Sequence, residues 1–377
     1  MLLNDVDLIS VDDHVIEHAN VWQDRLPAAH RERGPRVDER DGIPVWVYDG
    51  RDYPPLGLDA VAGDDPSKFS LKTKAFKDMR PGCYDPKARV ADMDQDGVAA
   101  QLCFPQFPRF AGQTFAEAAD KELALLCVRA WNDFILDEWC AAAPTRFIPL
   151  AIVPLWDAQL AAAEIERTAS KGARAITFTE NPVPLGMPSF WTDHWDPMFS
   201  ALEDAEMPMC LHIGSSSKIT IPSTDVPMAV IVSLMALNSM SACSDLCFST
   251  VFEKHPRLKV VFSEGGAGWA AYMLEKMDYV WTRHRHYNEV NQTRPPSETF
   301  DQHIWVAQIT DAVGIATRHQ IGVHKMLWES DYPHSDCLWP NSRTNAEEQL
   351  RDVPDDEARR FAETNARTLF RFEKPSS

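Results

Sequence analysis

Short apolar runs alternate with longer helical stretches along the whole chain, and this alternation most constrains the fold. We interpret eight runs as strands, at residues 7–14, 99–105, 147–154, 173–180, 208–214, 259–266, 304–310 and 325–334. Most are apolar at consecutive positions, as strands of a parallel sheet covered by helices on both faces must be. The sequence therefore predicts an α/β fold with a parallel sheet.

Helical stretches separate these runs. Residues 115–143 carry apolar side chains at i, i+3 and i+4 spacing, and residues 156–172 end in a glycine that stops a helix. Residues 229–256 read as one long, largely buried helix or a pair, and residues 354–372 as a final amphipathic helix. Eight strands alternating with helices favour a (β/α)₈ TIM barrel over an open sheet, whose first strand should lead into a glycine-rich turn.

The domain organisation follows from length and from one long insertion. A barrel of this type accommodates all 377 residues, so we predict a single domain over residues 1–377. Residues 19–95 separate the first two predicted strands and are rich in Pro, Asp and Arg. Because a structureless loop of this length is uncommon, we expect a small subdomain or lid over the barrel mouth, in which "IPVWVYDG" forms one arm of a hairpin.

Charge and cysteine usage exclude several classes of partner. The formal net charge of −19 repels phosphate backbones, so we expect no nucleic-acid partner. The eight cysteines form no CxxC pair, and the first residues lack the pattern of a signal peptide. No apolar run approaches the ~18 residues of a membrane span. We expect a cytoplasmic protein that binds a small molecule, does not bind membranes, and forms a homo-oligomer, either a dimer or a tetramer.

Ionisable side chains stand where four predicted strands end, which is where barrels of this kind carry their chemistry. Asp12 and His14 are two residues apart, so both face the barrel interior, while Asp13 points the other way. The other strand ends supply His212, Glu264, and then Glu329, Asp331 and His334. A mixture of imidazole and carboxylate suits Zn²⁺, Mn²⁺ or Fe²⁺, whereas Mg²⁺ and Ca²⁺ favour oxygen ligands.

Each of these residues has a structural alternative when it is taken singly. His212 could be a hydrogen-bonded core histidine, Asp331 a turn residue, and Glu264 a side chain that faces solvent. Their joint occurrence at four strand ends is what predicts a divalent metal site. Such an ion would offset the repulsion between the carboxylates and lower the pKa of a bound water toward ~7.

With these motifs in hand, the chain resembles the amidohydrolase superfamily, and within it the branch of aminocarboxymuconate-semialdehyde and γ-resorcylate type decarboxylases. The resemblance spans essentially the whole chain. It rests on Asp12-x-His14 in the first strand, "MCLHIG" around His212, "HPRLKVV" at 255–261, "WDP" at 195–197 and "ESDYPH" around Asp331. It implies a distorted TIM barrel whose metal ligands are Asp12, His14, His212 and Asp331.

Two positions depart from the family pattern. Members carry His or Glu where this chain has Asp12, and the characterised decarboxylases have a histidine at the end of strand six, where this chain has Glu264 in "SEGGAG". No lysine ends the fourth strand, which argues against a carbamylated-lysine dinuclear site. A second ion held by Glu264 with His334, or with a histidine of 284–286, remains an alternative.

We therefore expect a metal-dependent hydrolase that acts on a small carboxylated or aromatic substrate through metal-activated water. Asp331 or Glu264 serves as general base, and His334 and Arg109 bind substrate anions, although both could be ordinary loop residues. The alternatives are a non-oxidative decarboxylase, a dinuclear variant with oxygenase-like chemistry, and a non-catalytic subunit that keeps its metal as a structural plug.

Overall fold

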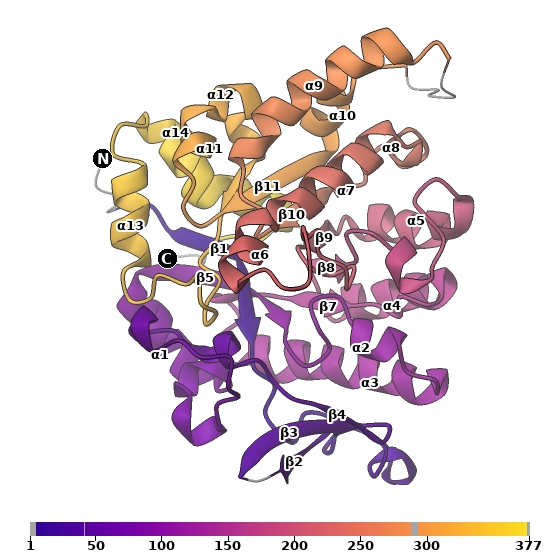
Figure 1. Ribbon diagram of the computed structural model, residues 1–377, viewed down its shortest axis with the longest axis vertical. Coiled ribbons are helices and arrows are strands. Elements are labelled where there is room, and N and C mark those ends of the chain that lie inside the picture. The colour runs from indigo at the N-terminus through magenta and orange to yellow at the C-terminus, as the bar shows by residue number, and fades with distance from the viewer. Residues whose placement is uncertain (1–4, 41, 288–292, 375–377) are drawn as a thin grey trace.

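The computed structural model describes residues 5–40, 42–287 and 293–374 (Figure 1). All eight predicted runs form strands within it, and the pairing between neighbours is parallel. The strands are β1 (Leu8–Val15), β5 (Val98–Pro105), β6 (Phe147–Ile148), β7 (Leu150–Ile152), β8 (Ala175–Phe178), β9 (Met209–His212), β10 (Val260–Ser263), β11 (Ile304–Gln308) and β12 (Met326–Trp328).

The strands lie in chain order in two parallel sheets, β1-β5-β6 and β7 through β12. The predicted strand 147–154 is two short strands, because Pro149 between β6 and β7 has no N–H to donate to a ladder. On the other side, the N–H of Asp331 donates to the carbonyl of Asp12 at 2.8 Å, and that of His14 to Tyr332 at 2.7 Å. These bonds join β1 to the segment after β12 in the arrangement of a distorted (β/α)₈ barrel.

Helices cover the outside of the strands (Figure 1). Aspartate side chains begin several of them by accepting backbone N–H groups, as Asp85, Asp120 and Asp157 do for α1, α3 and α4. The helices are α1 (Pro86–Asp96), α2 (Gln113–Ala116), α3 (Lys121–Phe134), α4 (Ala158–Ser170), α5 (Asp196–Ala205), α6 (Met228–Leu234), α7 (Ala236–Phe248), α8 (Val251–Lys254), α9 (Gly268–His284), α10 (Pro296–His303), α11 (Ala312–Ala316), α12 (Arg318–Ile321), α13 (Ser342–Gln349), α14 (Asp355–Arg359) and α15 (Asn365–Phe370).

The predicted helical stretches are confirmed, with breaks inside them. Residues 115–143 form α2 and α3, which continues through one π-helical turn, Ile135–Trp139. Residues 229–256 form three helices, α6 to α8, rather than one or two. In the C-terminal stretch, a π-helical turn at Arg360–Thr364 joins α14 to α15.

A separate apolar core fills the barrel interior below the strand ends. It contains one to three side chains from each of the strands and is closed by residues of α15 and its following turn: Ile9, Val11, Ala100, Leu102, Phe104, Ile148, Leu150, Ala175, Cys210, Val261, Ala307, Leu327, Ala366, Leu369, Phe370 and Phe372. The register of β1 against β5 shifts between Ser10 and Asp13. This β-bulge lets Val11 join the apolar core while Asp12 and His14 point into the site above it.

The insertion after β1 contains a small antiparallel sheet, as predicted for its hairpin arm. Strands β2 (Arg36–Arg40), β3 (Ile43–Tyr48) and β4 (Arg51–Tyr53) pair in sequence order, and they lie at the bottom of Figure 1 below α1 and α3. The assignment of residues 1–377 to a single domain stays a prediction.

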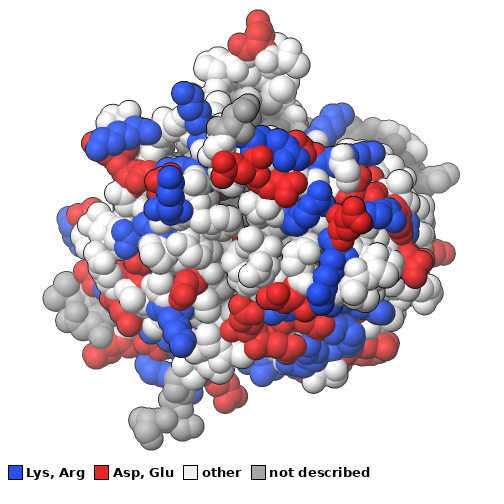
Figure 2. All heavy atoms as spheres, turned by 90° about the horizontal axis from the view of Figure 1, so that it is seen from below, with Lys and Arg blue, Asp and Glu red and all other residues white. Residues whose placement is uncertain are grey.

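The segment Met228–Phe248, which contains α6 and α7, is apolar and long enough to cross a membrane by length and composition alone. The sequence analysis is therefore wrong that no apolar stretch reaches this length. A core helix passes the same test, and α7 buries Cys243, Leu246 and Cys247. Helix α6 buries no residue, and Met228 and Val232 are each 41% exposed. On the face shown in Figure 2, acidic and basic side chains are interspersed.

The buried guanidinium of Arg89 connects the insertion to the strands beneath the site through hydrogen bonds. Arg89 of α1 is fully buried and donates to the carbonyls of Gly82 at 2.7 Å and His14 at 2.5 Å, and to Gln101 Oε1 at 3.1 Å. Its guanidinium carbon also lies 4.2 Å from the ring centroid of Tyr332. One planar side chain thus connects the insertion, β1, β5 and the segment after β12.

We expect Arg89→Lys to lower the free energy of unfolding by about 2–4 kcal/mol, because an ammonium cannot reach three acceptors in this fork geometry. Denaturant unfolding measures the change. Arg257→Lys is the matched control, since its side chain is 64% exposed and should change stability by less than ~0.5 kcal/mol. Equal stability of the two variants would contradict this role.

Candidate metal centre

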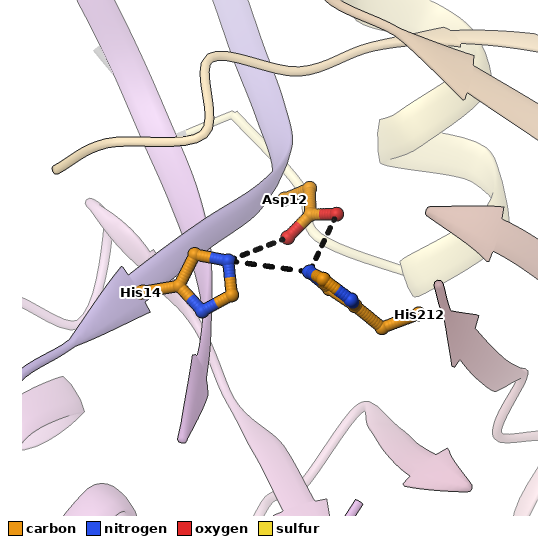
Figure 3. A group of neighbouring side chains, drawn as sticks. All are labelled: Asp12, His14 and His212. Atoms are coloured by element: carbon orange, nitrogen blue, oxygen red, sulfur yellow. Dashed lines mark hydrogen bonds and ion pairs between the residues drawn. The ribbon is translucent and has the colours of Figure 1, made fainter. Parts of the chain in front are cut away.

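Two strands bring three predicted ligands together at the barrel mouth. Asp12 and His14 lie on β1, and His212 is the last residue of β9; all three are fully buried. Figure 3 shows their side chains pointing toward one another. Asp12 Oδ1 lies 3.6 Å from His14 Nε2, and Asp12 Oδ2 lies 3.6 Å from His212 Nε2. Asp13 points away, and its Oδ1 accepts from Gln101 at 3.0 Å.

The two imidazoles face each other through the same type of nitrogen. His14 Nε2 and His212 Nε2 are 3.3 Å apart. His212 Nδ1 lies 2.7 Å from the carbonyl of Ile213, which fixes the proton on Nδ1 and leaves a lone pair on Nε2. A backbone acceptor on the other ring nitrogen is the usual arrangement of a metal-ligating histidine.

Asp331 and Glu264 complete the cluster from outside the strands. Strand β12 ends at Trp328 and β10 at Ser263, so the predicted strands 325–334 and 259–266 are too long. Both acidic residues have left-handed backbones, with φ of 54° at Asp331 and 59° at Glu264. This conformation costs a non-glycine residue about 1–2 kcal/mol and is typical of functional sites.

The left-handed turns aim both carboxylates at the histidines. Asp331 Oδ1 lies 3.2 Å from His14 Nε2, and Glu264 Oε2 lies 3.0 Å from His212 Nε2. Strand alternation, by which the sequence analysis placed Glu329 and Asp331 on one face, does not apply here, because both residues follow the strand.

The donor atoms fit a divalent ion. Both carboxylate oxygens of Asp12 and both of Asp331 are buried, and none of these four atoms makes a hydrogen bond. Ligand atoms about 2.0–2.2 Å from a tetrahedral ion stand about 3.3–3.6 Å apart, and the separations among Asp12, His14, His212 and Asp331 given above lie near this range. The structure thus brings together the four predicted ligands, whose role as ligands stays a prediction.

Burial shapes the protonation of the cluster. It raises the pKa of Asp12 well above its ordinary value, and the carboxylates of Glu329 and Glu264 add to this effect. Burial and Glu264 likewise raise the pKa of Asp331. Burial also lowers the pKa of His14. The folded site therefore disfavours these charges in the absence of a cation, and an ion would restore the carboxylates to their ionised form.

His334 lies beside the cluster, as predicted. Its Nδ1 is 2.9 Å from Asp331 Oδ1, and its Nε2 is 2.9 Å from Gln106 Oε1. Its ring stacks on that of His14, with centroids 3.6 Å apart. On the far side, Phe110 stacks on His212 with centroids 3.9 Å apart. Gln106 and Phe110 were missed in the sequence, although both follow β5 closely enough for the strand-end rule to have found them.

The described residues give little support for a second metal ion. Two groups of side chains could hold a metal, Asp12 with His14 and His212, and His14 with Asp331 and His334; since both use His14, they describe one site. His284 ends α9 and contacts Tyr287. The 17 residues of α9 carry it about 25 Å from the strand ends where the helix begins. The alternative that uses a histidine of 284–286 is therefore wrong.

Arg109 lies apart from the metal cluster. Its guanidinium pairs with Glu117, and its side chain is 40% exposed. It lines a cavity of about 460 Å³ between the insertion and the loop after β5, whose wall also contains Phe110. Its predicted contact with a substrate anion stays a prediction, as does that of His334.

Replacing Asp12 by Asn should have opposite effects on the metal-free and metal-loaded protein. Without metal, Asp12→Asn removes one of the crowded carboxylates, so we expect a gain of about 1–2 kcal/mol in the free energy of unfolding. With manganese present, the variant loses the stabilisation that the wild type receives, about 2.7 kcal/mol at a hundredfold excess over Kd. Denaturant unfolding with EDTA or with MnCl₂ measures both. Destabilisation under both conditions would contradict the account.

Comparison with known proteins identifies the family of the chain. The chain is 24% identical over 309 residues to γ-resorcylate decarboxylase of Rhizobium sp. strain MTP-10005, covering 76% of this chain and 86% of that protein. The structure superposes on an amidohydrolase of Mycobacterium avium subsp. paratuberculosis with a TM-score of 0.76 and 22% identity, covering 97% and 99% of the two chains.

It also superposes on the manganese-bound 5-carboxyvanillate decarboxylase of Novosphingobium aromaticivorans, with a TM-score of 0.65 and 16% identity over 97% of each chain. Identities this low establish the fold alone. The family model described as Amidohydrolase matches residues 17–372, nearly the whole chain. The strand order, the strand-end cluster and this match together show that the chain belongs to the amidohydrolase family.

Proposed function

We propose that this chain is a metal-dependent carboxy-lyase that removes a carboxylate, as carbon dioxide, from a small aromatic or unsaturated acid. The observation that carries the proposal is the buried cluster of Asp12, His14, His212 and Asp331 at the strand ends. The sequence analysis preferred hydrolysis because Glu264 stands where the decarboxylases have histidine. The named relatives that match are decarboxylases, and they support the alternative instead.

The protein side chains supply the proton that this reaction needs. When the bond to the carboxylate breaks, its electron pair stays on the ring or vinyl carbon, which must take up a proton while carbon dioxide leaves. Asp331 and His334 are in contact, with 2.9 Å between Oδ1 and Nδ1, so a proton can pass between them and be delivered to that carbon. Water outside the site then returns a proton to this pair of side chains.

A divalent ion at the cluster would fix the substrate carboxylate and stabilise negative charge that develops during the reaction. We propose manganese, because solved decarboxylases of this fold hold it; zinc and iron suit the same ligands. The cavity of about 460 Å³ supports an aromatic substrate, since its walls include Trp46, Tyr53, Phe76, Phe107 and Phe110.

Hydrolysis is the second candidate, and one contact favours it. Glu264 Oε2 lies 3.0 Å from His212 Nε2, where a carboxylate can take the proton of a water that attacks substrate. Burial alone would raise the pKa of Glu264, but the His212 imidazole lowers it overall, so this group is ionised at neutral pH. We also propose that the protein is cytoplasmic and homo-oligomeric, with the exposed apolar residues of α6 available for contact between copies.

The manganese-loaded chain should release carbon dioxide from at least one member of a panel containing 2,6-dihydroxybenzoate, 5-carboxyvanillate and related hydroxybenzoates. In D₂O the product should carry one deuterium at the carbon that lost the carboxylate. Asp331→Asn should reduce kcat by about 10³-fold or more and His334→Gln by about 10²-fold. Cleavage of lactones or esters in a parallel panel, with no carbon dioxide from any acid, would contradict the proposal.

Glu264→Gln separates the two candidates. A lyase should keep kcat within about tenfold, because the proton comes from Asp331 and His334. A hydrolase that uses Glu264 as general base should lose about 10²–10⁴-fold. Arg257→Lys, an exposed substitution, controls for handling of the protein, and steady-state rates on one accepted substrate provide the comparison.

A further inference from the structure

A second cavity lies beside the metal cluster and is lined by acidic groups, among them Glu264, which contacts His212. It has a volume of about 820 Å³ and lies between the insertion and the ends of β10, β11 and β12. Six carboxylate side chains line it, and none of its lining residues is Lys, Arg or His: the acids are Asp64, Asp65, Glu264, Asp311, Glu329 and Asp336. We call this space the acidic cavity.

Three of these carboxylates have structural partners. Asp311 accepts from the N–H groups of Ala267 and Gly268 at the start of α9. Asp65 accepts from Ser67, and Asp64 pairs with Lys74. These three groups therefore fix the walls of the acidic cavity.

The other three, Glu264, Glu329 and Asp336, have no lysine or arginine partner among the described residues. Glu264 contacts His212, and Glu329 accepts only the N–H of Glu264, at 3.1 Å, while being 1% exposed. Asp336 lies on the loop after β12, at the rim of the cavity. Three carboxyl groups without a basic partner thus gather in one wall beside the metal cluster, where a cation would favour their ionised forms.

A buried amide in the same wall also lacks a partner. Gln308, the last residue of β11, is 1% exposed, and neither its Oε1 nor its Nε2 makes a hydrogen bond. A buried amide left unpaired costs about 1–3 kcal/mol, so its persistence points to a ligand that supplies the missing bond. Because its neighbours are carboxylates, this ligand is a donor with positive charge.

We propose that the acidic cavity binds the protonated amine of the substrate. An ammonium group offers three N–H donors and one positive charge, which match Gln308 Oε1 and the carboxylates of Glu329 and Asp336. The inference rests on the proposed function and narrows it: the substrate is an acid with an amino group on a saturated carbon, which is protonated at neutral pH. Its carboxylate meets the metal cluster and its ammonium group enters the acidic cavity.

The other possible occupants fit this wall less well. A second carboxylate of the substrate would face three like charges with no basic side chain in the lining. A second metal ion needs three close ligand atoms, and both such groups in the described part of the chain lie at the first cluster, around His14. An organic cation requires only charge and one or two hydrogen bonds.

The test compares two probes of similar size and shape, the cationic benzylammonium and the neutral benzyl alcohol, titrated calorimetrically into the manganese-loaded full chain at pH 7. We expect benzylammonium to bind at least tenfold more tightly. Asp336→Asn and Gln308→Met should each weaken benzylammonium three- to tenfold and leave benzyl alcohol unchanged. Asp204→Asn, an 81% exposed acid elsewhere, is the charge-matched control and should change neither affinity.

Three results would overturn the inference. They are equal affinity for the two probes, equal effects of Asp336→Asn and Asp204→Asn, or two manganese ions per chain of which Asp336→Asn removes one. Neither probe carries a carboxylate, so the result does not depend on whether the enzyme releases carbon dioxide. A chain that prefers benzylammonium but fails every decarboxylation assay would therefore refute the proposed function and keep this inference.

Discussion

Repulsion between buried carboxylates is the constraint on which the structure at the strand ends of this barrel depends. Asp12, Glu264, Glu329 and Asp331 share one fully or largely buried space, and burial lowers the pKa of His14 among them, so this histidine does not offer a positive charge. A bound cation therefore adds to the stability of such a site. Three features hold these groups in place despite the cost in free energy. They are the β-bulge in β1, the left-handed turns at Glu264 and Asp331, and the buried side chain of Arg89.

We assign different roles to the two cavities beside this cluster. The aromatic one has Phe110, which stacks on His212, in its wall and suits the apolar body of a substrate. The acidic one meets the cluster at Glu264 and suits a positively charged group. The position at which this chain departs most from the decarboxylase pattern, Glu264, lines the acidic cavity. Glu264 stands where the decarboxylases have histidine, which argues against assuming their mechanism for this chain. Our proposal explains this glutamate by the positive charge of the substrate group that it faces.

Much of the fold was predictable from sequence because it is encoded locally. Apolar runs of strand length identified all eight strands, and the i, i+2 spacing placed Asp12 and His14 on one face. What sequence missed depends on distant pairing. The bulge in β1 is defined only against β5, and strands β10 and β12 stop early because Glu264 and Asp331 adopt left-handed turns. The acidic cavity is built from segments near residues 64, 308 and 336, so the unpartnered Gln308 could not be recognised.

The central claim is that one divalent ion sits between Asp12, His14, His212 and Asp331. Anomalous diffraction from crystals of the manganese-loaded chain, collected on both sides of the manganese absorption edge, tests it directly. The account predicts one strong anomalous peak per chain, about 2.0–2.3 Å from the two Nε2 atoms and from the oxygens of both aspartates. A peak elsewhere, or no peak in crystals grown with excess manganese, would contradict it.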